Sequence, residues 1–182
     1  FRYSDFNMGR AERHSAENDR FKTDWLTGSK GRLNKLVAAD ADAIVAGLYE
    51  YHASYQAHCP WAADKLSFIP FPIVPSPDAA RRIASQPDAA APLKLFIGIQ
   101  RSRNSYKGTD IMLRAARRVA ARYPDDCVLQ VAENVPFAQY VKLLDESAVQ
   151  LDQLYSYTPA MNSLEAMARG MIVVGGGEPE NY

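Results

Sequence analysis

Short apolar runs alternate with amphipathic segments along the second half of the chain. Strands are predicted by the mostly apolar residues at 93–99 and 127–131 and by the uninterrupted apolar run at 171–174. An unbroken run such as 171–174 is typical of a parallel strand that is buried on both faces. Between them, residues 111–123 and 136–144 carry apolar side chains at helical spacing. This strand–helix order predicts an α/β fold with a Rossmann-like parallel sheet flanked by helices.

The first half of the chain shows the same alternation in shorter segments. Residues 33–40 and 49–58 predict helices, and residues 43–46 and 66–69 predict strands. Residues 1–30 are polar and show no clear period.

A stretch rich in proline and alanine separates the two halves, with prolines at 70, 72, 75 and 77. Proline is not tolerated inside a central strand or helix, so this stretch predicts a domain boundary. We expect three parts: an incomplete N-terminal α/β domain at 1–74, a stiff linker at 75–92, and a truncated C-terminal Rossmann-like domain at 93–182.

Two strand-to-helix junctions in the C-terminal part carry candidate chemistry. In the junction nearer the C-terminus, Thr158 can cap a helix that Pro159 opens and Gly170 ends. A helix amino end beside the carboxyl end of a parallel strand offers free N–H groups to a phosphate. Glu165 lies in an apolar part of this helix. A carboxylate in such a place needs a hydrogen-bond donor, and a ribose diol is a suitable one.

The first junction, QRSRNSYKGTD at 100–110, brings Arg101, Arg103 and Lys107 to the end of an apolar strand. It lacks the glycine and the Lys-Ser/Thr pair of a Walker A loop. Its charge pattern by itself supports a surface loop and a phosphate-binding loop equally well.

Both junctions resemble parts of a known enzyme family. The segment NSLEAMARG with the apolar strand after it, the pair Lys107-Gly108, and the closing GGGEPENY resemble the C-terminal domain of group-1 (family 4) nucleotide-sugar glycosyltransferases of the two-Rossmann-domain, or GT-B, type. The segment ADAIVAGLYEYHASYQ resembles the end of their N-terminal domain. Tyr157 stands where that family has a first glutamate.

The resemblance implies roles for several residues. Lys107 and an arginine, either Arg101 or Arg103, would bind the donor diphosphate, with Arg103 and Lys107 as the catalytic pair. Glu165 would bind the nucleotide ribose. The wall of the donor pocket would be formed by Tyr157, Thr158, Met161 and Asn162.

We therefore expect a glycosyltransferase that moves a sugar from a nucleotide diphosphate-sugar to an acceptor hydroxyl, on a glycan or a lipid-linked molecule. The resemblance implies retention of the anomeric configuration and no metal or other cofactor. Two alternatives stay open: a sugar-nucleotide epimerase or phosphorylase, and a non-catalytic sugar-nucleotide-binding module.

Composition and charge argue against several other classes of function. The 182 residues have a formal net charge of zero, so no long-range field favours nucleic acid, and the arginines of residues 111–123 are interpreted as a solvated face. No apolar run approaches the roughly 20 residues of a membrane helix. Cys59 and Cys127 match no metal spacing and are expected as free thiols. We expect a cytoplasmic protein, with the inner face of the membrane as the second location.

Overall fold

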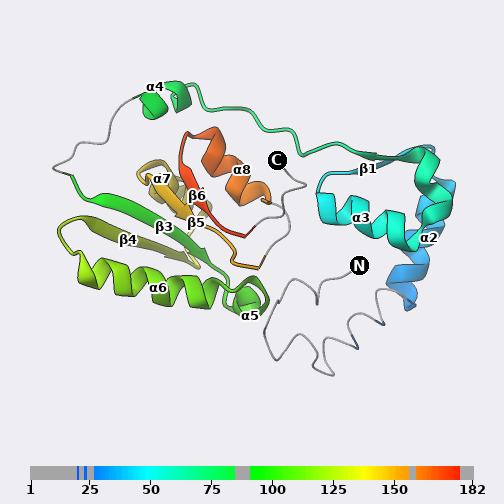
Figure 1. The fold of residues 1–182 in the computed structure, drawn as a ribbon, viewed down its shortest axis with the longest axis horizontal. Coiled ribbons are helices and arrows are strands. Elements are labelled where there is room, and N and C mark those ends of the chain that lie inside the picture. The colour runs from blue at the N-terminus through cyan, green and yellow to red at the C-terminus, as the bar shows by residue number, and fades with distance from the viewer. Residues whose placement is uncertain (1–19, 21–22, 24–26, 85–90, 156–158, 177–182) are drawn as a thin grey trace. The chain divides into compact units, whose positions relative to one another are not determined.

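The computed structural model describes residues 20, 23, 27–84, 91–155 and 159–176 (Figure 1). The chain divides after Phe71 into two compact units, each with its own parallel sheet. No helix in these described ranges is both long enough and apolar enough to cross a bilayer.

The N-terminal unit is a small α/β arrangement. Its strands pair in parallel, and its elements are α2 (Ser29–Asp40), β1 (Ile44–Ala46), α3 (Tyr49–His58), the 3-10 helix η3 (Pro60–Lys65) and β2 (Leu66–Phe68). The predicted helices and strands of this half are confirmed. The buried face of α2 carries Gly31 and Ala38, whereas Leu33, Leu36 and Val37 are exposed.

The C-terminal unit holds a four-stranded, fully parallel sheet with strand order β4-β3-β5-β6. Its elements are α4 (Ala79–Ala84), β3 (Leu93–Ile99), the 3-10 helix η4 (Arg101–Arg103), α5 (Asn104–Lys107), α6 (Thr109–Arg122), β4 (Cys127–Glu133), α7 (Phe137–Asp145), β5 (Val149–Leu151), α8 (Met161–Ala168) and β6 (Ile172–Val174). The predicted α/β fold with a Rossmann-like sheet is confirmed.

Helices cover both faces of this sheet. Helix α6 packs on one face, and α7 and α8 pack on the other (Figure 1). The core under α7 and α8 contains Phe96 of the central strand β3, Leu144 of α7 and Ala166 of α8. Phe96 and Ile97 are both fully buried, because adjacent residues of a strand point to opposite faces.

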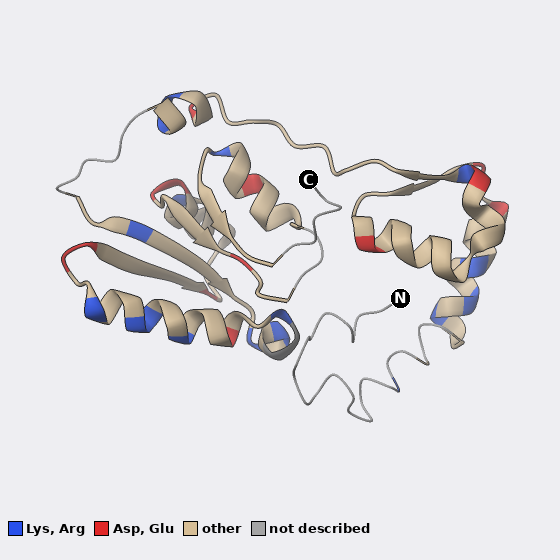
Figure 2. Cartoon of the chain, in the orientation of Figure 1, with Lys and Arg blue, Asp and Glu red and all other residues tan. Residues whose placement is uncertain are grey.

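Arginines line the outer side of α6 (Figure 2). All four are exposed, as the sequence predicts: Arg114, Arg117, Arg118 and Arg122. The buried side of the helix is centred on Ala116, whereas Ala115, Val119 and Tyr123, which the sequence places on the inner face, are exposed. The apolar stripe is therefore rotated by about one residue from the predicted one.

Two further expectations about the last strand and helix are wrong. Strand β6 is the edge of the described sheet, so Ile172 and Val174 are 65% and 48% exposed rather than buried on both faces. Helix α8 begins at Met161 with Ala160 as its N-cap residue and without a side-chain cap. The predicted cap, Thr158, lies outside the described residues.

Part of the segment that we expected to be a linker, 75–92, packs on the C-terminal unit. The backbone N–H of Ser76 donates to the carbonyl of Ala168 at 2.7 Å, and α4 follows directly. Gly170 has a φ of +74°, and a Cβ there would lie 2.9 Å from the carbonyl oxygen of Ala79. The close approach of α4 to the end of α8 therefore depends on glycine at this position.

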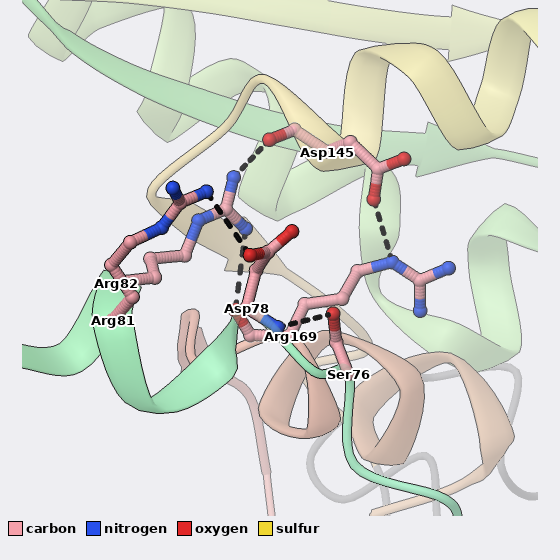
Figure 3. A pocket seen from close by; sticks show the side chains of 6 residues that line it. All are labelled: Ser76, Asp78, Arg81, Arg82, Asp145 and Arg169. Carbon is pink, nitrogen blue, oxygen red and sulfur yellow. Dashed lines mark hydrogen bonds and ion pairs between the residues drawn. The ribbon is translucent and has the colours of Figure 1, made fainter.

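Arg82 joins α4 to the ends of two other helices (Figure 3). Its guanidinium donates to the carbonyl of Arg169 at 3.4 Å and to the carbonyl of Asp145. These carbonyls end α8 and α7, where intrahelical partners are missing and the helix dipole is negative. Arg82 therefore acts as a shared C-terminal cap.

The hollow around this cap has a volume of about 560 Å³. Six polar residues line it: Ser76, Asp78, Arg81, Arg82, Asp145 and Arg169. It lies at the amino ends of β5 and β6, because α7 and α8 end just before these strands begin. Two negative helix ends and two carboxylates oppose an anionic ligand here, so we interpret the arginines as structural.

Replacing Arg82 with Ala is expected to lower the free energy of unfolding by about 1–2 kcal/mol, because charge-assisted hydrogen bonds to two helix ends are lost. Arg81→Ala is the matched control. Among the described residues its guanidinium pairs with the exposed Asp78 alone, at 3.0 Å, and an exposed pair contributes little. Urea unfolding of the two variants measures the difference. Equal losses would contradict the capping role of Arg82.

Candidate functional site

The topology of the C-terminal sheet marks one place for a ligand. Strands β3 and β5 are neighbours, but the chain leaves β3 toward β4 and leaves β5 toward β6, on opposite sides. In open α/β sheets a ligand binds outside the carboxyl ends of two such strands, where their connections diverge. Both junctions predicted from the sequence, 100–110 and the one before α8, lie at this divergence.

Backbone hydrogen bonds hold the two junctions together. The carbonyl of Lys107 accepts the N–H groups of Leu154 at 2.9 Å and Tyr155 at 3.1 Å. Lys107 ends α5, and residues 154 and 155 follow β5. Segments almost fifty residues apart in the chain therefore meet at one carbonyl group.

Gly108 makes this approach feasible. It links α5 to α6 with a φ of +72°, a left-handed conformation that favours glycine. A Cβ at this position would lie 2.8 Å from Cβ of Leu154 and 2.9 Å from the ring of Tyr155. The Lys107-Gly108 pair thus has a backbone role in addition to its charge.

The ammonium of Lys107 is a half-buried positive charge at this site. Burial lowers its pKa; the negative charge of Asp152 raises it and the positive charge of Arg103 lowers it further. Across the described residues the ammonium makes no hydrogen bond and no ion pair. A desolvated cation without a partner is stabilised by an anionic ligand.

Asp152 follows β5 directly and connects three parts of the site. Its backbone N–H donates to the carbonyl of Val174 at 3.0 Å, and its carboxylate Oδ2 accepts the hydroxyl of Ser163. Ser163, in the first turn of α8, is buried. We did not predict Asp152 from the sequence, although an acidic residue directly after an apolar strand is a signal of this kind of site.

The side chain of Tyr140, on α7, also lies at the carboxyl ends of the strands. Its ring packs edge-on against Phe96, with 5.2 Å between centroids, and lies over Gly98 near the carboxyl end of β3. Burial raises the pKa of its phenol, and the negative charge of Asp152 raises it further. The phenol is therefore protonated at neutral pH. The sequence predicts only that Tyr140 lies on the apolar face of the helix at 136–144. That prediction does not place its side chain beside the site.

The two candidate arginines differ in their surroundings. Arg101 pairs with Glu133 at the end of β4, and this pair is largely exposed. Arg103 is exposed and near enough to Lys107 to affect the pKa of that lysine. Among the residues that the structure describes, the Arg103 guanidinium makes no hydrogen bond. Arg103 therefore fits the predicted role beside Lys107 better than Arg101 does.

The remaining candidates lie on or before α8. Met161 and Asn162 are exposed in its first turn. Glu165 is half-buried one turn further on, and its Oε2 accepts a hydrogen bond from Arg169, which also pairs with Asp145 at 2.8 Å. Tyr157 and Thr158 lie outside the described residues.

This arrangement can hold an anion against Lys107, and Asp152 links the site to Ser163 in the first turn of α8. No protein-family model matches the chain, and no curated protein matches it in sequence.

Replacing Gly108 with Ala is expected to lower the free energy of unfolding by at least about 2 kcal/mol. The left-handed conformation and the overlap with Leu154 and Tyr155 both contribute to this loss. Gly98→Ala is the control, because a Cβ there meets only the Tyr140 ring, at 3.4 Å. Its expected loss is below about 1 kcal/mol. Thermal unfolding compares the two, and an unaffected Gly108→Ala variant would show that the junctions tolerate separation.

Proposed function

We propose that this protein is a nucleotide-sugar glycosyltransferase, which moves a sugar from a nucleotide diphosphate donor to an acceptor hydroxyl. The observation that carries the proposal is the half-buried ammonium of Lys107 at the divergence of β3 and β5, which makes no hydrogen bond to any residue that the structure describes. The motifs at both junctions, which resemble those of group-1 glycosyltransferases, support the same reading.

The reaction requires positive groups where the leaving diphosphate gains charge. Breaking the anomeric C–O bond transfers an electron pair to the diphosphate oxygen. Preorganised donors that stabilise this charge lower the barrier. Lys107 would supply a charge-assisted hydrogen bond, and Arg103 a second positive charge at the mouth of the site.

The amino end of α8 would add backbone donors to the same diphosphate. The N–H groups in the first turn of a helix have no intrahelical partners and lie at the positive end of the dipole. Met161 and Asn162 occupy this turn. Glu165 would bind the ribose hydroxyls through Oε1, since Arg169 bonds to Oε2.

Replacing Lys107 with Ala is expected to weaken the binding of uridine or guanosine diphosphate by about 10- to 100-fold, the value of one charge-assisted hydrogen bond. Binding of the parent nucleosides should not change. Lys142→Ala, an exposed lysine on α7, is the control and should bind like the wild type. Titration calorimetry measures all three proteins. Equal weakening for nucleoside and diphosphate would remove the phosphate role of Lys107.

A turnover assay with a nucleotide-sugar donor, run with and without an acceptor after these titrations, separates the proposed reaction from its alternatives. Turnover that depends on an added acceptor supports transfer. Release of nucleotide diphosphate without an acceptor product indicates an epimerase or hydrolytic reaction, and binding without turnover indicates a binding module.

Replacing Glu165 with Gln tests the ribose contact. The variant is expected to bind the parent nucleotide several-fold more weakly than the wild type, because an anionic acceptor of the ribose hydroxyls is lost. A 2′,3′-dideoxy nucleotide cannot make this contact, so its affinity should be the same for both proteins. Similar losses for both ligands would mean that Glu165 acts through Arg169 and the fold instead.

A further inference from the structure

Two polar side chains at the site have no part in binding a diphosphate. These are the carboxylate of Asp152 and the phenol of Tyr140. Both lie at the carboxyl edge of the sheet, Asp152 at the end of β5 and Tyr140 over Gly98 of the adjacent strand β3. Neither was expected from the motifs in the sequence.

The two side chains offer opposite hydrogen-bonding functions. Only Oδ2 of Asp152 bonds to Ser163, so the carboxylate keeps further acceptor capacity. The Tyr140 hydroxyl makes no hydrogen bond within the described part of the chain, and its ring is held in place by Phe96. A fixed acceptor directly after β5 and a fixed donor from α7, over the neighbouring strand β3, match a ligand rich in hydroxyl groups.

The charge of Asp152 adds a second constraint. A carboxylate near Lys107 repels any further negative charge on a bound molecule. It therefore disfavours a ligand that carries an acidic group beyond the diphosphate.

We propose that Asp152 and Tyr140 bind the group attached to the donor diphosphate, and that together they select a neutral, polyhydroxylated group over an acidic one. Asp152 accepts hydrogen bonds from its hydroxyls, and Tyr140 donates one to a hydroxyl oxygen. This inference rests on the proposed function and names the class of sugar that the site takes.

The test compares three ligands: uridine diphosphate, its glucose conjugate and its glucuronate conjugate, with the guanosine diphosphate series if that base binds more tightly. The wild type is expected to bind the glucose conjugate about tenfold more tightly than the glucuronate conjugate. Asp152→Asn keeps an acceptor for Ser163 but removes the charge. It should bind both conjugates equally, when each affinity is compared with that of the same variant for the diphosphate alone.

Tyr140→Phe keeps the ring against Phe96 and removes only the hydroxyl. It should weaken binding of the glucose conjugate by about three- to tenfold, the value of one neutral hydrogen bond, and leave the diphosphate unaffected. Asp125→Asn and Tyr123→Phe make the same chemical changes at exposed positions after α6 and should match the wild type. Circular dichroism melting confirms that each variant is folded.

The outcomes distinguish this inference from the proposed function. If the diphosphate binds in a Lys107-dependent way, but neither variant changes the ranking or affinity of the conjugates, the roles of Asp152 and Tyr140 are wrong and the proposed function stands. If the wild type binds none of the three ligands, both are wrong. A wild type that prefers the glucuronate conjugate also overturns the inference.

Discussion

The site in the C-terminal unit depends on one carbonyl group, that of Lys107. It accepts two backbone N–H groups from the segment after β5 and so fixes two loops that are distant in sequence. Backbone groups that are buried without a partner are costly, so this pairing both satisfies the loops and defines where they meet. Gly108 gives the loops room, because any larger residue would overlap the opposite segment. The side chain of Lys107 is then held by its own backbone at the divergence of the strands.

Two neighbouring charges act on Lys107 at this site. Lys107 is desolvated, and Asp152 and Arg103 act on it with opposite signs. At the amino ends of the strands, by contrast, the guanidinium groups of Arg82 and Arg169 bond to helix ends and carboxylates. Cationic side chains therefore serve two purposes in this unit. Those at the amino ends of the strands secure helices, whereas the ammonium of Lys107, at the carboxyl ends, makes no hydrogen bond to the described residues.

The sequence predicts most elements of this fold, because their signals are local. The apolar run at Leu93–Ile99 and the helix at Tyr49–His58 match the structure end to end. The Lys107-Gly108 junction could also be recognised, since glycine and charge stand at the end of a strand. The proximity of Asp152 and Tyr140 could not, because it depends on which strands are neighbours. Arg82 bonds to residues 63 and 87 positions away, and no periodicity encodes such a contact.

The docking of α4 has a practical consequence for dividing the chain. A fragment begun at Leu93, where the sheet starts, would lack Ser76, Ala79 and Arg82, and the ends of α7 and α8 would lose the groups that cover them. The compact C-terminal unit instead starts at Pro72. Proline-rich composition is thus an unreliable guide to where such a chain can be cut, since a stretch without regular strands can still be an integral part of a folded body.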